Sequence, residues 1–584
     1  MVLRKLSHNP HKPMAKSFEL THEQQEFIEQ APPESVLISC PGSGKTRTAV
    51  LRFIQRCKVA KDHGVAFLSY TNVAVEEALA RAREANAGGL VGYPNLASTI
   101  DAFFRRFVFE PFIRCVHENV PLNVAVFESR PPAAIAGDKE YELWGIRPDE
   151  TLKGKKIKRP LLAWDVRAYL TENGDLRYEY NKDHFRQDWV EVPERFKANV
   201  EKAKASYLER GYATYNDILL FSSVLLDDHD LNIASILARR FGEIIVDEAQ
   251  DTSALHQDLL ERLADAGAKI CYIGDPKQGI YQFNRANPAY LEELARTGHK
   301  RYELTKNFRS IKAIVDIVNG RFDVDMKHDR DPEHELHGAY VFVGTEEQAL
   351  VTFSGLLERS SIAASNAAVI VRNRSHLSST LQDYDGKGWR SGPRLALEAW
   401  QRDRRMDLDG ALSSAIRLLR VAGADEPTRT MDENQLKELG WLFLRGEHFP
   451  EPAGDETPKA WGVRLRVGIE SFLRQQEIPL NPKFGDRFAT NGLTDEGNAL
   501  EEFTFTPPTL RTTVIHQVKG ESISGVLVIA PKKQHKEWLN QEASDEEQNV
   551  CYVAFTRAAN VLVLHCPTED IAAEWRKHGF VDIP

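Results

Sequence analysis

Five consecutive residues, Gly42 to Thr46 (Gly-Ser-Gly-Lys-Thr), combine residue types that bind phosphate groups. Glycines let the backbone curl so that several N–H groups, Ser43 among them, point at one anion. The Lys45 ammonium can then reach the outer phosphates of a nucleoside triphosphate, and the Thr46 hydroxyl can ligate Mg²⁺. An ordinary glycine-rich turn is the competing interpretation, because Ser39 stands where the usual pattern has its first glycine.

The flanking sequence supplies the elements that such a loop requires. The apolar run Val36–Ile38 predicts a buried strand of a parallel sheet. After the loop, residues 47–56 carry apolar side chains at helical spacing. Strand, loop and helix thus follow in the order that favours phosphate binding.

A helix start precedes the loop at Leu20-Thr21-His22-Glu23-Gln24. Thr21 and Gln24 have the spacing of a capping box, which is the simplest interpretation. Gln24 also has an amide that can donate to and accept from one edge of a base. Because it stands shortly before the phosphate loop, we predict that it recognises adenine.

Two carboxylates follow a second buried strand, Glu243–Val246. Asp247 and Glu248 come directly after it, at the edge where parallel sheets bind ligands. One carboxylate, Asp247, is predicted to hold Mg²⁺ through water, and the other, Glu248, to polarise the attacking water.

A third strand, Lys269–Ile273, leads into Gly274–Phe283. Within this segment Gln278 is placed to sense a γ-phosphate. Tyr281 and Phe283 offer flat faces on which bases can stack. An aromatic pair is just as typical of a protein core, so both interpretations stay open.

Composition limits the class of protein. The chain has 584 residues, enough for about four domain-sized units. Its net charge of −10 argues against attraction of nucleic acid by the whole surface, although a local basic groove stays compatible with it. The six cysteines show no C-x-x-C spacing, which favours a reducing, cytoplasmic environment. Since no apolar run approaches membrane length, we expect no membrane partner.

The distance along the chain between Lys45 and Asp247 is far greater than one nucleotide-binding core needs. Residues 104–211 are therefore interpreted as a domain inserted into that core. This region contains the basic run Lys153–Arg159, which is more typical of a solvated loop than of a nucleic-acid contact.

The order of these segments resembles superfamily 1 helicases of the UvrD/Rep/PcrA type. The matching stretches follow the family order from residue 20 to residue 558: Leu20–Gln24, Ser39–Thr46, Tyr70–Ala74, Thr99–Phe103, Asp247–Asp251, Gly274–Phe283, Leu304–Ser310, Val371–Arg374, Val514–Glu521 and Tyr552–Ala558.

The resemblance implies an α/β fold with two RecA-like parallel-sheet cores, each interrupted by a mainly helical subdomain. The implied boundaries are 1–105 and 212–300 for the first core, 106–211 for its insertion, 301–380 and 508–584 for the second core, and 381–507 for a compact second insertion. ATP would bind between the cores, with single-stranded DNA across them.

The resemblance also implies roles for single residues. The catalytic set comprises Lys45, Glu248, Gln278, Arg309 and Arg557, the two arginines being assigned to the second core. Besides Gln24 and the loop, the family pattern places Arg47 and Phe308 beside the adenine. The candidates for DNA contact are Tyr70, Tyr281, Phe283, Arg372 and His516.

Two departures from the family pattern affect these expectations. Asn284 stands where relatives often have an arginine after the aromatic of the third motif, and Arg285 follows it. The usual Lys-Gly-Leu-Glu becomes Lys519-Gly520-Glu521-Ser522, so the residue that reaches the ribose is not identified.

Three functions fit these observations. The first is an ATP-dependent helicase that moves 3′ to 5′ on single-stranded DNA or at a single-strand/duplex junction. The second is a DNA-stimulated ATPase or translocase with little unwinding by itself. The third is a helicase-like component of a nuclease-linked, antiphage complex of the Gabija kind, with a nuclease as partner protein. The expected cofactors are ATP and Mg²⁺ in all three.

Overall fold

The computed structural model describes residues 20–84, 87–120, 142–143, 150–152, 155–157, 161–171, 173–181, 189–280, 285–373, 391–404, 408–423, 433–451, 456–481, 484–488, 510–540 and 544–584. The chain forms two compact units. The first comprises Met1–Arg309 with Asp325–Asp329, and the second comprises Ser310–Val324 with Arg330–Pro584.

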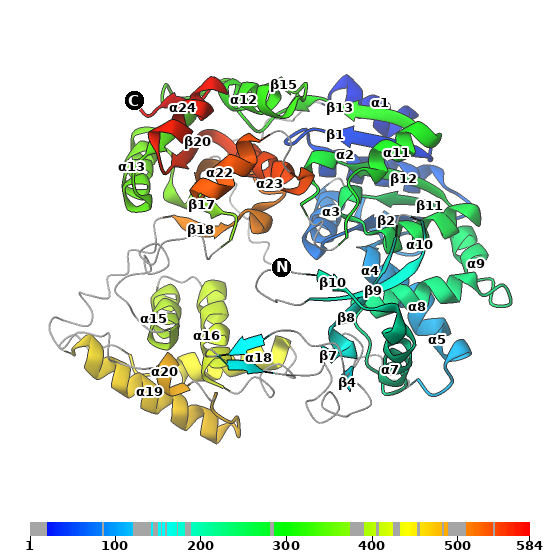
Figure 1. Ribbon diagram of the computed structural model, residues 1–584, viewed down its shortest axis with the longest axis horizontal. Helices are drawn as coiled ribbons and strands as arrows, with labels where there is room; N and C mark the ends of the chain where they lie inside the picture. Colours follow the sequence, from blue (N-terminus) through cyan, green and yellow to red (C-terminus); the bar gives the residue numbers. More distant parts are fainter. Residues whose placement is uncertain are drawn as a thin grey trace, which may run out of the picture. The chain divides into compact units, whose positions relative to one another are not determined.

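The first unit contains a six-stranded parallel sheet with the strand order β13-β1-β12-β11-β2-β3 (Figure 1). The strands span, in that order, Lys300–Leu304, Ser35–Ser39, Lys269–Gly274, Phe241–Val246, Gly64–Ser69 and Leu96–Thr99. The sequence-predicted strands at 36–38, 243–246 and 269–273 are confirmed.

Successive residues of a strand point to opposite faces of the sheet. Here both faces are apolar, and helices cover each of them. Ile244 and Val246 pack into one apolar cluster, whereas Ile245 between them packs into the other. Strands that are buried on both faces consist of continuous apolar residues, and for this reason they could be predicted from the sequence. The helices that contribute to these clusters include α1 (His22–Gln30), α2 (Lys45–Val59), α3 (Asn72–Glu84), α4 (Ile100–Phe104), α5 (Glu110–Val116), α8 (Tyr215–Asp227), α9 (Ile233–Arg240), α10 (Ala254–Asp265) and α11 (Tyr290–Thr297).

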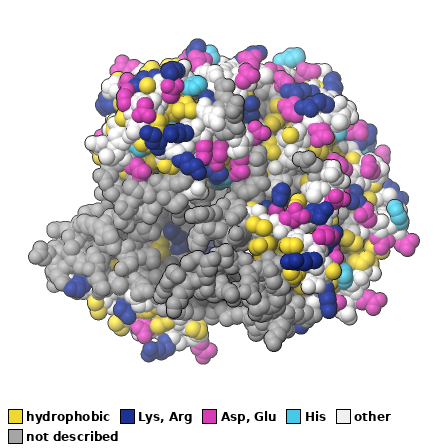
Figure 2. Space-filling model, viewed as in Figure 1, with side chains coloured by type: hydrophobic (Ala, Val, Ile, Leu, Met, Phe, Trp, Pro, Cys, Tyr) yellow, Lys and Arg dark blue, Asp and Glu magenta, His cyan; other side chains and the backbone are white. Residues whose placement is uncertain are grey.

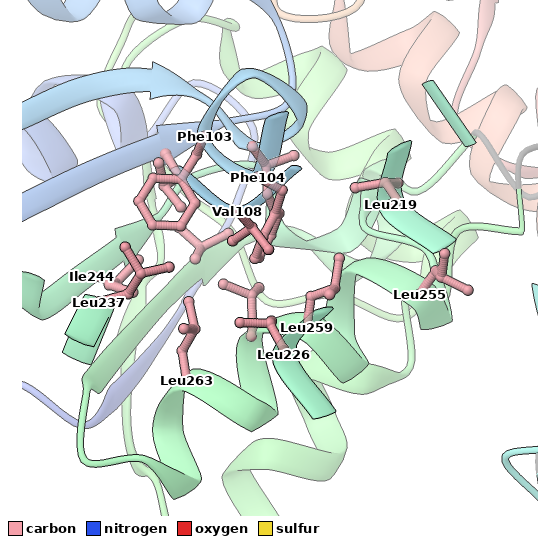
Figure 3. Close-up of a cluster of buried hydrophobic side chains, with 14 of the residues drawn as sticks. Phe103, Phe104, Val108, Leu219, Leu226, Leu237, Ile244, Leu255, Leu259 and Leu263 are labelled. Carbon is pink, nitrogen blue, oxygen red and sulfur yellow. The ribbon is translucent and has the colours of Figure 1, made fainter. Parts of the chain in front are cut away.

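The larger cluster joins segments that lie far apart in sequence (Figure 3). Phe103 and Phe104 from α4 pack with Leu226 from α8 and Leu259 from α10, and all but Leu226 are fully buried. Each such side chain contributes about 1.5–3 kcal/mol by leaving water. This core holds the carboxyl edge of the sheet rigid, and that edge carries the candidate site.

Among its described residues, the insertion into the first core contains strands as well as the predicted helices. It contains an antiparallel three-stranded sheet, β8 (Val166–Leu170), β9 (Leu176–Asn181) and β10 (Trp189–Glu191), followed by α7 (Lys197–Glu209). Charged side chains on these strands pair with one another across the sheet. The run Leu176–Asn181 alternates apolar and polar residues, as a strand with one buried face does, but it was not among the strands predicted from the sequence.

The second unit is built around another six-stranded parallel sheet, with the order β18-β17-β19-β20-β16-β21. These strands span Arg511–Val514, Ala367–Val371, Ile523–Ile529, Ala558–Cys566, Gly338–Val343 and Val581–Asp582. Its helices include α12 (Lys312–Phe322), α13 (Glu346–Arg359), α22 (Lys532–Leu539), α23 (Asp545–Thr556) and α24 (Glu569–Lys577). Two parallel sheets with helices confirm the predicted α/β class with two cores.

The second insertion is helical, as predicted. Its helices are α15 (Ser391–Arg404), α16 (Leu408–Ala422), α18 (Glu433–Arg445), α19 (Pro458–Gln475) and α20 (Phe484–Arg487). They enclose a separate apolar core around Trp461, Phe443 and Phe472. A core of its own makes this subdomain a folding unit distinct from the sheet.

The predicted boundary between the cores at residue 300 is wrong. Strand β13 pairs in parallel with β1 along its whole length and completes the first sheet. The first unit ends at Arg309 rather than at residue 300, so the assignment of Arg309 to the second core is corrected as well.

The described surface carries acidic and basic side chains that are mixed over both units (Figure 2). This distribution agrees with a modest net charge and gives no single-sign field on the face shown. Among the described residues, every helix is too short or too polar to cross a membrane.

Candidate functional site

The predicted phosphate loop lies at the carboxyl end of β1 and leads directly into α2, which begins at Lys45. Gly42 and Gly44 have φ angles of 72° and 78°, in the left-handed region that favours glycine. A Cβ atom at Gly42 would lie only 2.6 Å from the Arg309 Cβ. The backbone conformation therefore requires glycine at both positions. At Gly42, close packing against Arg309 requires it as well.

Ser39, the departure from the usual glycine pattern, is the last residue of β1 and is buried. Its Oγ donates to the Gly274 carbonyl at 3.2 Å. This bond joins the ends of β1 and β12, which form two walls of the site. Ser39, in place of the usual glycine, thus adds a hydrogen bond between β1 and β12, and the Gly42–Gly44 loop keeps its conformation.

Lys45 and the two carboxylates after β11 are brought together. The Lys45 Nζ lies 2.5 Å from Glu248 Oε2, and both side chains are largely shielded from solvent. Burial alone would lower the pKa of Lys45, but the charges of Glu248 and Asp247 raise it above its ordinary value. Lys45 therefore stays a cation, as binding of a phosphate requires.

Asp247 and Glu248 are held differently. Asp247, at the strand end, is only 1% exposed, and its N–H donates to the Leu68 carbonyl at 2.8 Å. Glu248 follows with a φ of 56°, which is rare for a residue other than glycine, asparagine or aspartate. Such strain persists only where the surroundings enforce it, and it is concentrated at functional sites.

A hydrogen-bonded chain links Glu248 to Gln278 through two residues to which sequence analysis gave no role. The Gln250 amide donates to Glu248, and its Oε1 accepts from the Asp275 N–H at 3.1 Å. Asp275 in turn accepts from the Gln278 Nε2 at 2.7 Å. Burial raises the pKa of Asp275, while Gln278 and Lys45 oppose that rise. The polar environment expected around a reacting phosphate is thus preorganised.

Gln24 has the predicted capping box, and its amide also touches the loop. Its Oε1 accepts from the Thr21 N–H at 3.0 Å, and its Nε2 donates to the Ser43 carbonyl at 2.9 Å. The capping interpretation is confirmed. Recognition of adenine by Gln24 stays a prediction, as do the adenine contacts of Arg47, in the first turn of α2, and Phe308.

The segment after β13 is bound to the phosphate loop within the same unit. Thr305 donates through its N–H and Oγ1 to Glu23 on α1, at 3.2 and 2.9 Å. The Phe308 N–H donates to the Gly42 carbonyl, and the Asn307 Oδ1 accepts from the Arg309 N–H at 2.8 Å. Arg309 thereby lies against the loop, where burial lowers its pKa to about 10 and leaves it a cation at neutral pH.

The residues of this site fit ATP with Mg²⁺. The left-handed glycines and the amino end of α2 form an anion cradle, and Lys45 adds a fixed positive charge. Thr46, in the first turn of α2, and Asp247, directly after β11, would offer the hydroxyl and carboxylate oxygens that Mg²⁺ prefers. When bound, the metal would neutralise charge on the phosphates.

A second feature of the first unit is a pocket of about 220 Å³ between the core and the inserted sheet. Tyr70, at the end of β2, lines it together with Tyr169 from β8 and His256 from α10. The His256 ring is 3.0 Å from Asp101 and meets Tyr70 edge to face. Aromatic faces in a pocket that also carries polar side chains are suited to stacked bases. Tyr281 and Phe283 lie outside the described residues.

In the second unit, Arg372 and His516 lie together at strand ends. The Arg372 guanidinium is 3.2 Å from the His516 Nε2 and donates to Glu547 at 3.0 Å. Glu546 lies 3.4 Å from the same guanidinium. The structure therefore brings together the two predicted DNA contacts, and it adds two carboxylates that the sequence did not connect with them.

Arg557 is fully buried at the start of β20. Its guanidinium donates to the Val553 carbonyl at 3.1 Å and to Thr556 Oγ1 at 3.1 Å. Glu521, at the motif that departs from the family pattern, forms a two-bond pair with Arg511. The Glu521 carboxylate is thus paired with an arginine of the second unit.

Comparison with known proteins identifies the first unit. Residues 20–298 match the family described as the UvrD/REP helicase N-terminal domain. This part of the chain is similar to UvrD/REP-type helicase domains. The resemblance to superfamily 1 helicases that the motifs predicted is thereby confirmed.

Curated relatives share parts of the sequence. The chain is similar to one subunit of the ATP-dependent helicase/nuclease of Exiguobacterium sibiricum, with 31% identity over 202 residues that cover 31% of this chain and 17% of that protein. The corresponding helicase/nuclease subunits from Listeria monocytogenes and Clostridioides difficile are each 30% identical, over 23% and 24% of this chain and 12% and 13% of their own lengths. The matched region is thus a small share of each relative.

Proposed function

We propose that the protein is an ATP-dependent DNA helicase or translocase that uses ATP with Mg²⁺. The observation that carries this proposal is the contact between Lys45 and Glu248 beside the Gly42–Gly44 cradle. This contact supports the proposal because it joins the residues proposed as the phosphate-binding cation and the general base, within the part of the chain that matches the UvrD/REP helicase N-terminal domain.

Hydrolysis follows from the roles of these side chains. Lys45 would hold the β- and γ-phosphates, and Glu248 would orient and deprotonate the attacking water. Gln278, positioned by Asp275, would detect the γ-phosphate. Arg309 lies against the loop and would add positive charge as negative charge spreads over the phosphate oxygens. From the family resemblance we assign the same task to Arg557.

The substrate is proposed to be single-stranded DNA or a single-strand/duplex junction, with movement from 3′ to 5′. Tyr70, Tyr281 and Phe283 would stack bases, and Arg372 and His516 would contact the backbone. Such binding accepts any sequence and weakens with salt, because backbone contacts release counterions. A soluble cytoplasmic location is part of the same proposal.

A second candidate is a helicase-like subunit that works with a nuclease and unwinds little alone. The names of the relatives, which describe subunits of a helicase/nuclease, favour this possibility, and a role in antiphage defence would be one form of it. Under this proposal a nuclease protein would be the partner.

A strand-displacement assay run beside a DNA-stimulated ATPase assay tests these proposals. We expect unwinding of a duplex with a 3′ single-stranded tail and not of one with a 5′ tail. Hydrolysis without displacement would instead support the translocase, and recovery of displacement only when a nuclease protein is added would support the second candidate. Absence of ATP hydrolysis with and without DNA would contradict all of them.

A further inference from the structure

We propose that Glu179 is a positioning residue that couples DNA binding to ATP hydrolysis through its ion pair with Arg285. This inference rests on the proposed function. Glu179 lies on β9 of the inserted sheet, whereas Arg285 belongs to the core and follows the segment that contains Gln278. The Arg285 Nε donates to Glu179 Oε1 at 3.1 Å, and a second guanidinium N–H donates to Oε2.

The surroundings of Glu179 are built around this pair. Its side chain is only 1% exposed, and a second arginine, Arg167 on β8, donates to it at 2.6 Å. Arg167 stacks at 3.4 Å on the Trp189 ring, and Arg285 stacks at 4.1 Å on the Tyr169 ring. A carboxylate held by two stacked guanidinium groups has a fixed place, because two-bond arginine pairs are geometrically specific.

Arg285 has a constrained backbone. Its φ is 60°, a conformation that costs energy for an arginine and must be enforced by its contacts. The side chain is nevertheless 47% exposed, so burial alone does not hold it in place. The two-bond ion pair with Glu179 fixes the position of this side chain, and we infer that it helps to hold the strained backbone of Arg285.

The residues directly after Arg285 contact both parts of the hydrolysis site. Ala286 forms an antiparallel bridge with Ser253, and the Asn287 N–H donates to the Thr252 carbonyl at 3.1 Å. Thr252 directly follows the Asp247–Asp251 motif. The Pro288 ring packs against Gly279, where a Cβ atom would lie 2.2 Å from its Cγ. Gly279 is the neighbour of Gln278.

A continuous path of described contacts therefore runs from the inserted sheet to both catalytic segments. Glu179 holds Arg285, and Arg285 begins the strip 285–288, which contacts Thr252 and Ser253, directly after the carboxylate motif, and Gly279, directly after the proposed γ-phosphate sensor Gln278. Arg285 and Arg167, the two partners of Glu179, also line the pocket to which Tyr70 belongs. Occupation of this pocket by a base would thus be transmitted to the hydrolysis site through an element that both sites contact.

The test compares Glu179→Gln, Arg285→Ala and their double variant with the wild type. We measure ATP turnover with and without single-stranded DNA, and the Kd of the same oligonucleotide. The ratio of stimulated to basal turnover is expected to fall about tenfold in each single variant, within the range of coupling between sites. The Kd should change much less. The double variant should resemble the singles, because both residues serve one link.

Arg177→Ala is the matched control. Arg177 lies two residues before Glu179 on β9, is partly exposed, and pairs with Glu194 at 3.0 Å. We expect its stimulation ratio to equal that of the wild type. Arg285→Lys keeps the charge but loses the two-bond fork, and an intermediate ratio is expected.

Thermal unfolding separates coupling from loss of fold. In Arg285→Ala the buried Glu179 carboxylate keeps its bond to Arg167, so this variant is expected to fold. It tests the coupling even if Glu179→Gln fails to fold. Wild-type stimulation in a folded Arg285→Ala variant would overturn the inference while leaving the proposed function standing. A wild-type protein whose ATP turnover is not raised by DNA would overturn the proposed function and the coupling together.

Discussion

The carboxyl edges of the two six-stranded sheets carry different chemistry, although both sheets are parallel and built from the same kind of strand. The first edge has a glycine loop, a lysine and clustered carboxylates within hydrogen-bonding distance. The second edge has Arg372 beside His516, and Arg372 is held by the Glu547 carboxylate of α23. The same scaffold thus carries a lysine beside a glycine loop in one unit and an arginine–histidine pair beside a carboxylate in the other.

The difference shows where function is determined in this protein. In a parallel sheet the strands fix positions, and the residues just after each strand supply the chemistry. β1 and β11 are followed by residues 40–44 and 247–251, whereas β17 and β18 are followed by Arg372 and by the turn that contains His516. The carboxyl edge of the first sheet is therefore expected to supply most of the residues that turn over ATP, and that of the second to add contacts to the DNA backbone.

The largest effect is expected for Lys45→Ala, which should abolish ATP turnover. The variant loses the cation that holds the outer phosphates and leaves Glu248 without its ion-pair partner. Turnover on single-stranded DNA is the measurement, and thermal unfolding checks the fold. Lys58→Ala, at the exposed end of the same helix, is the control. Near wild-type turnover in Lys45→Ala would refute the phosphate-loop assignment.

The next effect concerns the two arginines. Arg309→Ala and Arg557→Ala should each slow single-turnover hydrolysis by roughly 10³-fold with little change in ATP affinity, as expected for cations that act on the transition state. The double variant should lose much less than the product of the single losses, because both would serve one transition state. Mild, independent effects would show that the two arginines are structural and that Arg557 of the second unit contributes nothing to the chemical step.

Glu248→Gln should slow hydrolysis by about 10²-fold or more, the usual contribution of a general base. The amide keeps the shape of the side chain but cannot accept the proton. We therefore expect ATP and DNA to remain bound, which is measured as prolonged retention on a labelled oligonucleotide in ATP. Asp265→Asn, at the exposed end of α10, serves as control. Loss of nucleotide binding would assign Glu248 a structural role instead.

The smallest effect is expected in the second unit. Arg372→Ala should weaken binding to single-stranded DNA by roughly threefold to tenfold and reduce the salt slope by about one, whatever the sequence of the oligonucleotide. ATP affinity should stay unchanged. Arg576→Ala removes a surface arginine of the same unit and should change neither quantity. Equal DNA affinity for both variants would remove Arg372 from the binding surface.

Much of the first site could be predicted from the sequence because its residues are neighbours along the chain. The Gly42–Thr46 loop depends on local backbone conformation, and Asp247-Glu248 directly follows a strand that its apolar run discloses. The capping box at Thr21 and Gln24 is local as well. Short-range patterns of this kind are set by residue type and spacing, so a single sequence is sufficient to find them.

The errors and omissions have the opposite cause. The end of the first core was misplaced because β13 joins β1 across most of the domain, and its exposed charged residues gave no sign of a buried strand. Gln250 and Asp275 were given no role because each matters through a partner on another strand end. The inserted sheet is an exception, because Leu176–Asn181 carries a local alternation of apolar and polar residues that is typical of a strand and was not used.

The sequence by itself determined the family, the two-core α/β class and the identity of the loop and carboxylate residues. These could be predicted because each depends on short motifs of neighbouring residues. Only the tertiary structure decided which residues meet. It brought Lys45 to Glu248, packed Arg309 on Gly42, and joined Glu179 of the insertion to Arg285 of the core. The physical reason is that contacts between distant segments depend on sheet order and on the packing of a shared core, which no local pattern encodes.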